Sequence, residues 1–165
     1  MWAGIAQAAA GRRLGDISHA IERSVGAAGN YGLIREYTGH GIGTEMHMDP
    51  VVRNFGPPGQ GPRLRTGMAL AIEPMITRGS RHVAELEDGW TVVSVDGSRA
   101  AHFEQTVAIT ADGPWVLTAL EGASSAAAER AGVRLSRRDS AATAGPRDDD
   151  RLATRTAPGG DGDVG

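Results

Sequence analysis

The amino-acid sequence predicts an α/β protein of the α+β type, with one amphipathic helix followed by a mostly antiparallel sheet. Apolar residues in the first part of the chain recur at helical spacing. Later apolar stretches are short and are separated by Gly, Pro and Asp, which is typical of strands and turns. An Asp-Gly pair lies between two such stretches, and this arrangement is a strong hairpin signal. The 165 residues fit one ordinary domain with a tail.

The helix is expected between Leu14 and Ala28. Its apolar positions follow the i, i+3, i+4 spacing of a buried helical face: Leu14, Ile17, Ile21, Val25 and Ala28. Gly29 follows directly and is a suitable C-terminal stop for a helix.

The strands are expected after the helix, between turn signals. A glycine-rich segment, 39–43, is expected to break the first strand, and 57–62 to form a Pro/Gly loop. Pro74 is expected to end the second strand, and Asp88-Gly89 to form a hairpin turn. The predicted strands are 31–37, 68–72, 83–86, 91–95, 102–110 and 115–117, of which the last two should form a hairpin.

Composition divides the chain near Glu121, into a domain at 1–121 and a low-complexity segment at 122–165. From Arg134 to Gly165 the sequence combines clustered charge with Gly and Pro. Such a segment buries too little apolar surface to offset its ordering entropy. We therefore predict a disordered tail, after a short helix at about 126–131. A partner-binding tail is the functional alternative.

Composition also excludes several classes of protein. There are no cysteines, so any metal must be held by nitrogen and oxygen ligands. The net charge of −3 gives no reason to expect a nucleic-acid partner. No apolar run approaches the roughly 20 residues of a membrane-spanning helix. These features together predict a cytoplasmic protein.

Two histidines stand in a distinctive segment. His40 lies between Gly39 and Gly41, which lets other groups approach its imidazole closely. His47 follows shortly after. Taken alone, either could be an ordinary loop histidine. The other histidines lack a patterned neighbour and are interpreted as structural: His19, His82 and His102.

Two glutamates stand beside apolar strands. Glu73 follows the apolar run 69–72 and precedes Pro74. A buried carboxylate is costly unless it is paired or bound to a metal. Glu104 should share a strand face with His102, Thr106 and Ala108, and an exposed strand face is the ordinary alternative. One His and two Glu form a nitrogen and oxygen ligand set that suits Mn, Fe, Co or Zn.

An ordered series of motifs carries a family resemblance. They are Tyr37-Thr38-Gly39-His40-Gly41-Ile42-Gly43, then His47 and Pro50, then Gly67-Met68 with Ala71-Ile72-Glu73-Pro74-Met75, then Glu87-Asp88-Gly89-Trp90-Thr91, then Ala101-His102-Phe103-Glu104 with Thr106-Val107. Over about 14–120, this series resembles type I methionine aminopeptidases. A lone Gly-His-Gly-Ile-Gly would be weak, but five motifs in order are specific.

The resemblance implies the fold and the ligands. It implies the C-terminal part of the pita-bread fold, with a curved sheet. It implies a site for two divalent metals held by two Asp, one His and two Glu. His40 matches the His ligand, Glu73 a Glu ligand, and Glu104 the Glu that bridges both metals.

The resemblance also implies catalytic and substrate-binding roles. The metals of this family lower the pKa of the attacking water and polarise the carbonyl that follows the initiator methionine. Glu73 matches the proton shuttle, and His47 matches a histidine that contacts substrate and stabilises the tetrahedral intermediate. Trp90 and Met46 fall where the family lines its methionine pocket.

The chain also departs from the family pattern. In the family, the two Asp ligands and another catalytic His lie upstream of the helix predicted at Leu14. Asp16 matches neither Asp motif, and Gln105 stands where many members have His. We therefore expect an N-terminally truncated form, of little activity alone, for which a complementing N-terminal half is a candidate partner.

Two other functions remain open beside removal of the initiator methionine from peptides and nascent proteins. A non-catalytic peptide-binding module could reuse the fold, although such proteins usually lose metal ligands, and here His40, Glu73 and Glu104 are present. A proline-specific relative would share the fold and a similar ligand set. The segment Asp88-Gly89-Trp90-Thr91 favours the methionine enzyme.

Overall fold

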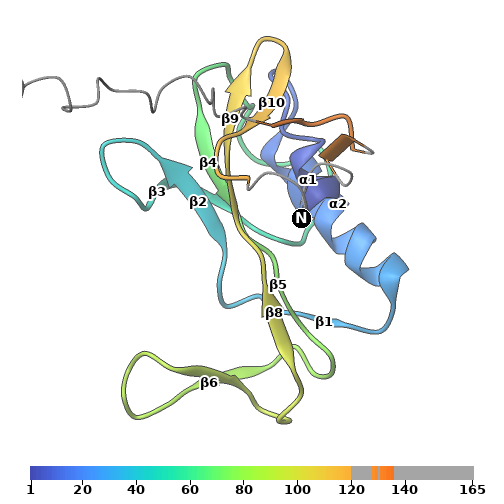
Figure 1. Cartoon of the computed structure of the whole chain (residues 1–165), viewed down its shortest axis with the longest axis vertical. Coiled ribbons are helices and arrows are strands. Elements are labelled where there is room, and N and C mark those ends of the chain that lie inside the picture. The colour runs from blue at the N-terminus through green and yellow to red at the C-terminus, as the bar shows by residue number, and fades with distance from the viewer. Residues whose placement is uncertain (120–127, 130, 136–165) are drawn as a thin grey trace, which may run out of the picture.

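A computed structural model describes residues 1–119, 128–129 and 131–135 (Figure 1). Its helices are α1 (Trp2–Ile5) and α2 (Leu14–Ala28). Its strands are β1 (Gly32–Leu33), β2 (Gly39–Ile42), β3 (Met48–Val52), β4 (Ala69–Ile72), β5 (Met75–Thr77), β6 (Val83–Glu85), β7 (Val92–Ser94), β8 (Ala100–His102), β9 (Gln105–Thr110), β10 (Gly113–Val116) and β11 (Arg134–Leu135). The predicted α+β class is confirmed. Among the described residues, no helix is long and apolar enough to cross a membrane.

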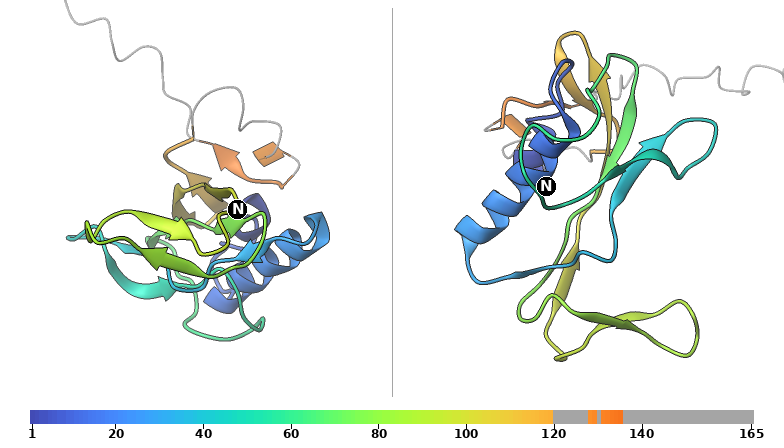
Figure 2. Two further views of the ribbon diagram at one scale, coloured as in Figure 1. Left: turned by 90° about the horizontal axis from the view of Figure 1, so that it is seen from below. Right: turned by 180° about the vertical axis from the view of Figure 1, so that it is seen from behind.

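The strands form three sheets. The six-stranded sheet has the order β11-β10-β9-β4-β2-β3, and all its neighbours are antiparallel except β10 and β11. The second sheet has the order β1-β5-β8, and β6 pairs with β7 in the predicted hairpin. Both helices lie on one side of the six-stranded sheet, whereas the β6–β7 hairpin lies at the far end of the molecule (Figures 1 and 2).

The hydrophobic core lies between α2 and the six-stranded sheet. Ile17 and Ile21 of α2 are fully buried together with Leu70 of β4 and Val107 of β9. Burying a side chain of this size stabilises the fold by about 1.5–3 kcal/mol. The helix has the predicted bounds and ends at Gly29, whose φ of 149° favours glycine. The predicted amphipathic pattern therefore identifies both the helix and the face that it buries.

The glycine-rich segment itself forms the strand β2, so the prediction that it breaks a strand is wrong. β2 lies between β3 and β4. A Cβ on Gly39 would lie 2.2 Å from the carbonyl oxygen of Ala71, and one on Gly41 would lie 2.1 Å from that of Asp49. The glycines are present because neighbouring backbones pass too close for a side chain.

The strand predicted at 102–110 is instead two strands in different sheets. β4 pairs with β9 through Ile72↔Gln105, and β5 pairs with β8 through Met75↔His102. The two ladders therefore share one register. Residues 73–74 lie opposite 103–104, where the pairing is interrupted between the two sheets. Pro74 has no N–H to donate to a ladder. The Phe103 N–H still donates to the Pro74 carbonyl across the gap, at 3.4 Å.

The first predicted strand is much shorter than expected. Within 31–37, two residues form β1, which pairs with β5. After Ile34, the side chains of Arg35 and Glu36 instead reach Glu22 of α2 and Arg81. The short helix α1 and the strand β3 were not predicted.

The predicted boundary at Glu121 and most of the tail lie outside the described residues. Ala128 and Val133 nevertheless belong to the hydrophobic core, and β11 pairs in parallel with β10. Described residues of the segment 122–165, as far as Leu135, therefore pack on the domain. Of the helix expected at about 126–131, residues 128 and 129 are helical, whereas 126, 127 and 130 are not described.

Candidate metal centre

The three predicted ligands lie on the face of the sheet opposite the helices. His40 of β2 is paired with Ala71 of β4, which is paired with Thr106 of β9. Directly paired residues project from the same face. The neighbouring pair along these strands, Leu70 and Val107, belongs to the hydrophobic core on the helical side of the sheet. Strand alternation therefore directs the His40 side chain away from the helices.

Glu73 and Glu104 meet at the interruption between the two sheets. Each lies directly beyond the end of a paired strand, β4 for Glu73 and β9 for Glu104. One ligand atom from each of His40, Glu73 and Glu104 lies within 4.8 Å of the others. Residues separated by 33 and 31 positions in the sequence thus converge because their strands are neighbours. Among the described residues, this is the group whose geometry suits a metal ion.

The His40 imidazole is oriented for metal binding. Its Nδ1 lies 2.9 Å from the carbonyl oxygen of Gly41. Because a carbonyl oxygen can only accept, Nδ1 must carry the proton, and Nε2 of the neutral ring then presents a lone pair. Nε2 faces the Glu73 Oε1 at 3.5 Å. Two acceptors that face each other need a cation between them, either a proton or a metal ion.

Glu73 is held from several sides. It is 8% exposed, and its backbone carbonyl accepts a hydrogen bond from the buried Asn54 side chain at 3.4 Å. Burial raises the pKa of the Glu73 carboxyl, and the charge of Glu104 raises it further, while His102 and His40 act in the opposite direction. A divalent ion would stabilise the ionised carboxylate that burial disfavours.

The donor set fits the divalent ion that the sequence implies. It consists of one imidazole and two carboxylates, which suit first-row transition ions such as Zn, Co, Mn or Fe. His40 has its other nitrogen held by a backbone carbonyl, as metal-binding histidines usually do. When bound, such an ion would be held by His40, Glu73 and Glu104.

His47 lies beside this group. Its ring centroid is 4.3 Å from that of His40, with the planes tilted by 56°. Its side chain is exposed and lies between β2 and β3. It is thus placed to contact a molecule that reaches His40 from solvent.

The two other predicted substrate contacts are exposed. Met46 is 70% exposed, in the loop between β2 and β3, and Trp90 is 87% exposed, in the β6–β7 hairpin. A pocket of about 380 Å³ lies next to the site instead, and its lining does not include these two residues. It is lined by Ile34, Tyr37, Met75, Val83, Val92, Val93, Ser94, Ala100, Ala101 and His102.

His102 joins the site, although its sequence setting suggested a structural role. Its Nε2 lies 3.3 Å from the Glu73 Oε2. The signal that could have found it is the register: once β4 and β9 are paired, Met75 falls opposite His102, next to Glu73. Local patterns in a single sequence do not show which strands pair or in which register.

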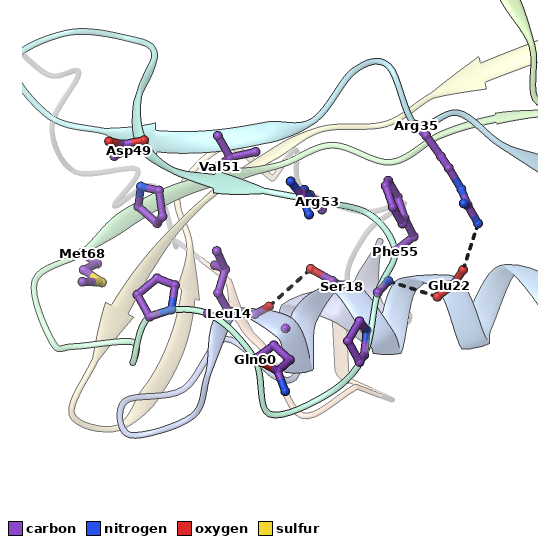
Figure 3. Close-up of a pocket in the computed structure, with 16 residues that line it drawn as sticks. Leu14, Ser18, Glu22, Arg35, Asp49, Val51, Arg53, Phe55, Gln60 and Met68 are labelled. Atoms are coloured by element: carbon purple, nitrogen blue, oxygen red, sulfur yellow. Dashed lines mark hydrogen bonds and ion pairs between the residues drawn. The ribbon is translucent and has the colours of Figure 1, made fainter.

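A second pocket, of about 1010 Å³, lies on the α2 side of β3 and contains none of the predicted site residues (Figure 3). Glu22 of α2 accepts a hydrogen bond from the Gly56 N–H and pairs with Arg35, and the Arg35 guanidinium lies over the Phe55 ring, 4.5 Å from its centroid. These contacts tie the loop after β3 to the helix. We interpret this pocket as a surface depression formed by that junction.

Comparison with known proteins identifies the class to which this fold and ligand group belong. The sequence profile of metallopeptidase family M24 matches residues 1–111. The chain therefore belongs to this metallopeptidase family. A prolidase from Pyrococcus horikoshii, 23% identical with a TM-score of 0.50, shares the fold alone.

Within the family, the chain is similar to several methionine aminopeptidases. The chain is 51% identical over 118 residues to methionine aminopeptidase 1 of Bacillus subtilis, covering 72% of this chain and 47% of the relative. It is 53% identical over 121 residues to the Mycobacterium tuberculosis methionine aminopeptidase 1, covering 70% and 46%. A crystal structure of methionine aminopeptidase from Thermotoga maritima superposes with a TM-score of 0.66 at 50% identity, covering 68% of this chain and 45% of that one. The chain spans about half the length of these relatives.

Proposed function

We propose that this chain carries the His and Glu ligands of a metal-dependent methionine aminopeptidase, which removes the N-terminal methionine from peptides and nascent proteins in the cytoplasm. The observation that carries the proposal is the convergence of His40, Glu73 and Glu104 within 4.8 Å, on strands distant in sequence. The methionine aminopeptidases that are about half identical to this chain support the choice of reaction.

The surroundings of the ligand group suit this reaction. The bound ion would polarise the scissile carbonyl and lower the pKa of the attacking water. Glu73 lies where it can accept a proton, because burial already raises its pKa. His47 flanks His40 on the solvent side, where it could donate a hydrogen bond to the developing oxyanion. The neighbouring 380 Å³ pocket offers apolar side chains to the methionine.

The ligand group has three members among the described residues, whereas a centre with two ions requires more donors. We therefore propose that full activity requires further carboxylates from a complementing N-terminal segment. The portion of the Bacillus subtilis relative that lies outside the match is a suitable source for this segment.

The test is release of methionine from a Met-Gly-containing peptide in the presence of Co²⁺ or Mn²⁺, with and without that segment. We expect metal-dependent release in the mixture, a loss of at least a hundredfold in Glu104→Ala, and full release in Glu85→Ala. Glu85 is a suitable control because it is an exposed carboxylate that belongs neither to the ligand group nor to the lining of the 380 Å³ pocket.

Three other results would change the proposal. Equal release by wild type and Glu104→Ala would contradict it. Release by the chain alone, lost in Glu104→Ala, would mean that the site completes itself and that no complementing segment is needed. Peptide binding without metal and without release, with or without the segment, would favour the non-catalytic binding module.

A further inference from the structure

The buried carboxylate of Glu73 has a histidine at each of its two oxygens. His40 Nε2 lies 3.5 Å from Oε1, and His102 Nε2 lies 3.3 Å from Oε2. The Asn54 side chain holds the backbone carbonyl of the same glutamate, at 3.4 Å. Each imidazole thus faces a different oxygen of one carboxylate, whose backbone is held separately.

The two histidines have different places in the site. His40 belongs with Glu73 and Glu104 to the group whose ligand atoms lie within 4.8 Å of one another, and His102 is not a member of this group. His102 stands at the end of β8, in the neighbouring sheet, and its side chain is 46% exposed. It therefore contacts a candidate ligand without belonging to the ligand group itself.

Strand pairing holds the backbone of His102 in place. Met75 lies opposite His102 in the ladder between β5 and β8. The residue after it, Phe103, donates its N–H to the carbonyl of Pro74 at 3.4 Å. A side chain on a paired strand is positioned more precisely than one on a loop. His102 can thus hold a neighbouring side chain in a defined direction.

The carboxylate of Glu73 needs such a support. The register shared by the two ladders continues from Ile72↔Gln105 and places Glu104 opposite Glu73. Like charges directly opposite each other are destabilising, and the terminal torsion of a glutamate has broad minima that do not fix the carboxylate plane. Before an ion binds, repulsion would therefore turn Glu73 away from Glu104 unless a donor held its other oxygen.

We propose that His102 is a positioning residue, whose Nε2–H donates a hydrogen bond to the Glu73 Oε2 and keeps Oε1 directed toward the ion position beside His40. The inference rests on the metal-binding part of the proposed function. Residues that orient a metal ligand typically contribute about 10–100-fold to metal affinity. His102 contributes in this way through Glu73 and adds little to the stability of the metal-free fold, because its side chain is half exposed.

The test is a titration of the full apo chain with Co²⁺, followed by calorimetry and by visible absorption. His102→Leu keeps a side chain of similar size but removes the donor, whereas His102→Gln keeps an N–H that can reach Glu73. We expect His102→Leu to weaken Co²⁺ binding by roughly 10–100-fold. Its ligand-field spectrum should also change, because Glu73 no longer keeps one orientation. His102→Gln should restore both the affinity and the spectrum of wild type.

His82→Leu is the matched control, because His82 is an exposed histidine that belongs neither to the ligand group nor to the lining of the 380 Å³ pocket. It should bind Co²⁺ as wild type does. Thermal unfolding in EDTA should give the same melting temperature for wild type and His102→Leu, since the proposed role is in metal binding. A melting temperature in EDTA that falls together with the affinity would show a purely structural role and overturn the inference.

Three results of the titration would also overturn it. The first is wild-type affinity in His102→Leu. The second is weak binding by His102→Gln, which would make the imidazole itself, rather than its N–H, the essential group. Both would leave the proposed function standing. The third is the absence of Co²⁺ binding in wild type, which would overturn the metal-binding part of the proposed function as well.

Discussion

At the scale of single residues, the buried carboxylate of Glu73 lies between two histidines in the candidate site. Its burial is tolerated because neighbours hold it: Asn54 bonds to its backbone carbonyl, and His40 and His102 flank its oxygens. The side-chain oxygen of Asn54 is itself buried without a hydrogen-bond partner among the described residues. A buried polar atom without a hydrogen-bond partner is costly for stability.

Asp16 allows the electrostatic part of stability to be measured away from the site. Its carboxylate accepts hydrogen bonds from the backbone N–H groups of Arg13, at 3.0 Å, and Gly59, at 2.8 Å. These bonds, that from Arg13 first, lower the pKa of Asp16. When a carboxyl group has a lower pKa in the folded state than in the unfolded state, its charge stabilises the fold at every pH above the unfolded-state pKa. This contribution is lost as the pH falls through the folded-state pKa.

We therefore predict that Asp16→Ala lowers the free energy of unfolding by about 1 kcal/mol at pH 7, as is typical for loss of a helix cap. The difference from wild type should shrink below roughly pH 4, near the ordinary Asp pKa. Urea unfolding at several pH values measures this difference in the free energy of unfolding, with Glu85→Ala as the control. A difference that stays constant down to pH 2 would show that the charge of Asp16 is not responsible.

At the scale of secondary-structure elements, β2 places His40 between two closely packed neighbours, β3 and β4. Its glycines allow β3 and β4 to approach closely on either side, and His40 alternates with them so that its side chain leaves the sheet on the face opposite the helices. The strand is thus stabilised by its neighbours rather than by its own propensity, since glycine is unfavourable in strands.

Gly39→Ala tests this close packing. The added Cβ would meet the backbone oxygen of Ala71, which cannot move without distorting β4. We expect a loss of about 2–4 kcal/mol in the free energy of unfolding. Gly26→Ala is the control, because Gly26 lies within α2 with no atom within 4 Å of the new Cβ. There alanine should stabilise the protein by about 0.5–1 kcal/mol. A gain in stability in Gly39→Ala similar to that in Gly26→Ala would indicate that propensity, not close approach, determines the effect.

At the scale of the whole molecule, the candidate centre joins two sheets. The long ribbon made by β4–β5 and β8–β9 is interrupted at 73–74 and 103–104, and the site lies at this interruption. An ion held by His40, Glu73 and Glu104 would connect β2 to both strands of the ribbon. Binding of the ion should therefore stabilise the entire fold, since the unfolded chain does not bring these residues together.

We predict that Co²⁺ at a hundredfold excess over its dissociation constant stabilises the folded chain by about 2.7 kcal/mol. For a protein of this size, the melting temperature should rise by roughly 5–10 °C. Calorimetry with Co²⁺ and with EDTA measures the shift, which should be largely absent in Glu104→Ala. An equal shift in that variant would place the stabilising ion elsewhere.

The sequence by itself determined the α+β class, the helix with its bounds and the hairpin at Asp88-Gly89, and it predicted the candidate ligands His40, Glu73 and Glu104. These features depend on local patterns: helical spacing, turn residues, and motifs that resemble one family. Such patterns can be read from the sequence, because each depends on residues that lie within a few positions of one another.

The tertiary structure alone decided the rest. It showed that the glycine-rich segment is a strand, because that depends on how closely other backbones pass. It brought the three candidate ligands together, because strand pairing sets distances between residues about 30 positions apart. It also placed His102 against Glu73, because the register between β5 and β8 follows from pairing that no local pattern encodes.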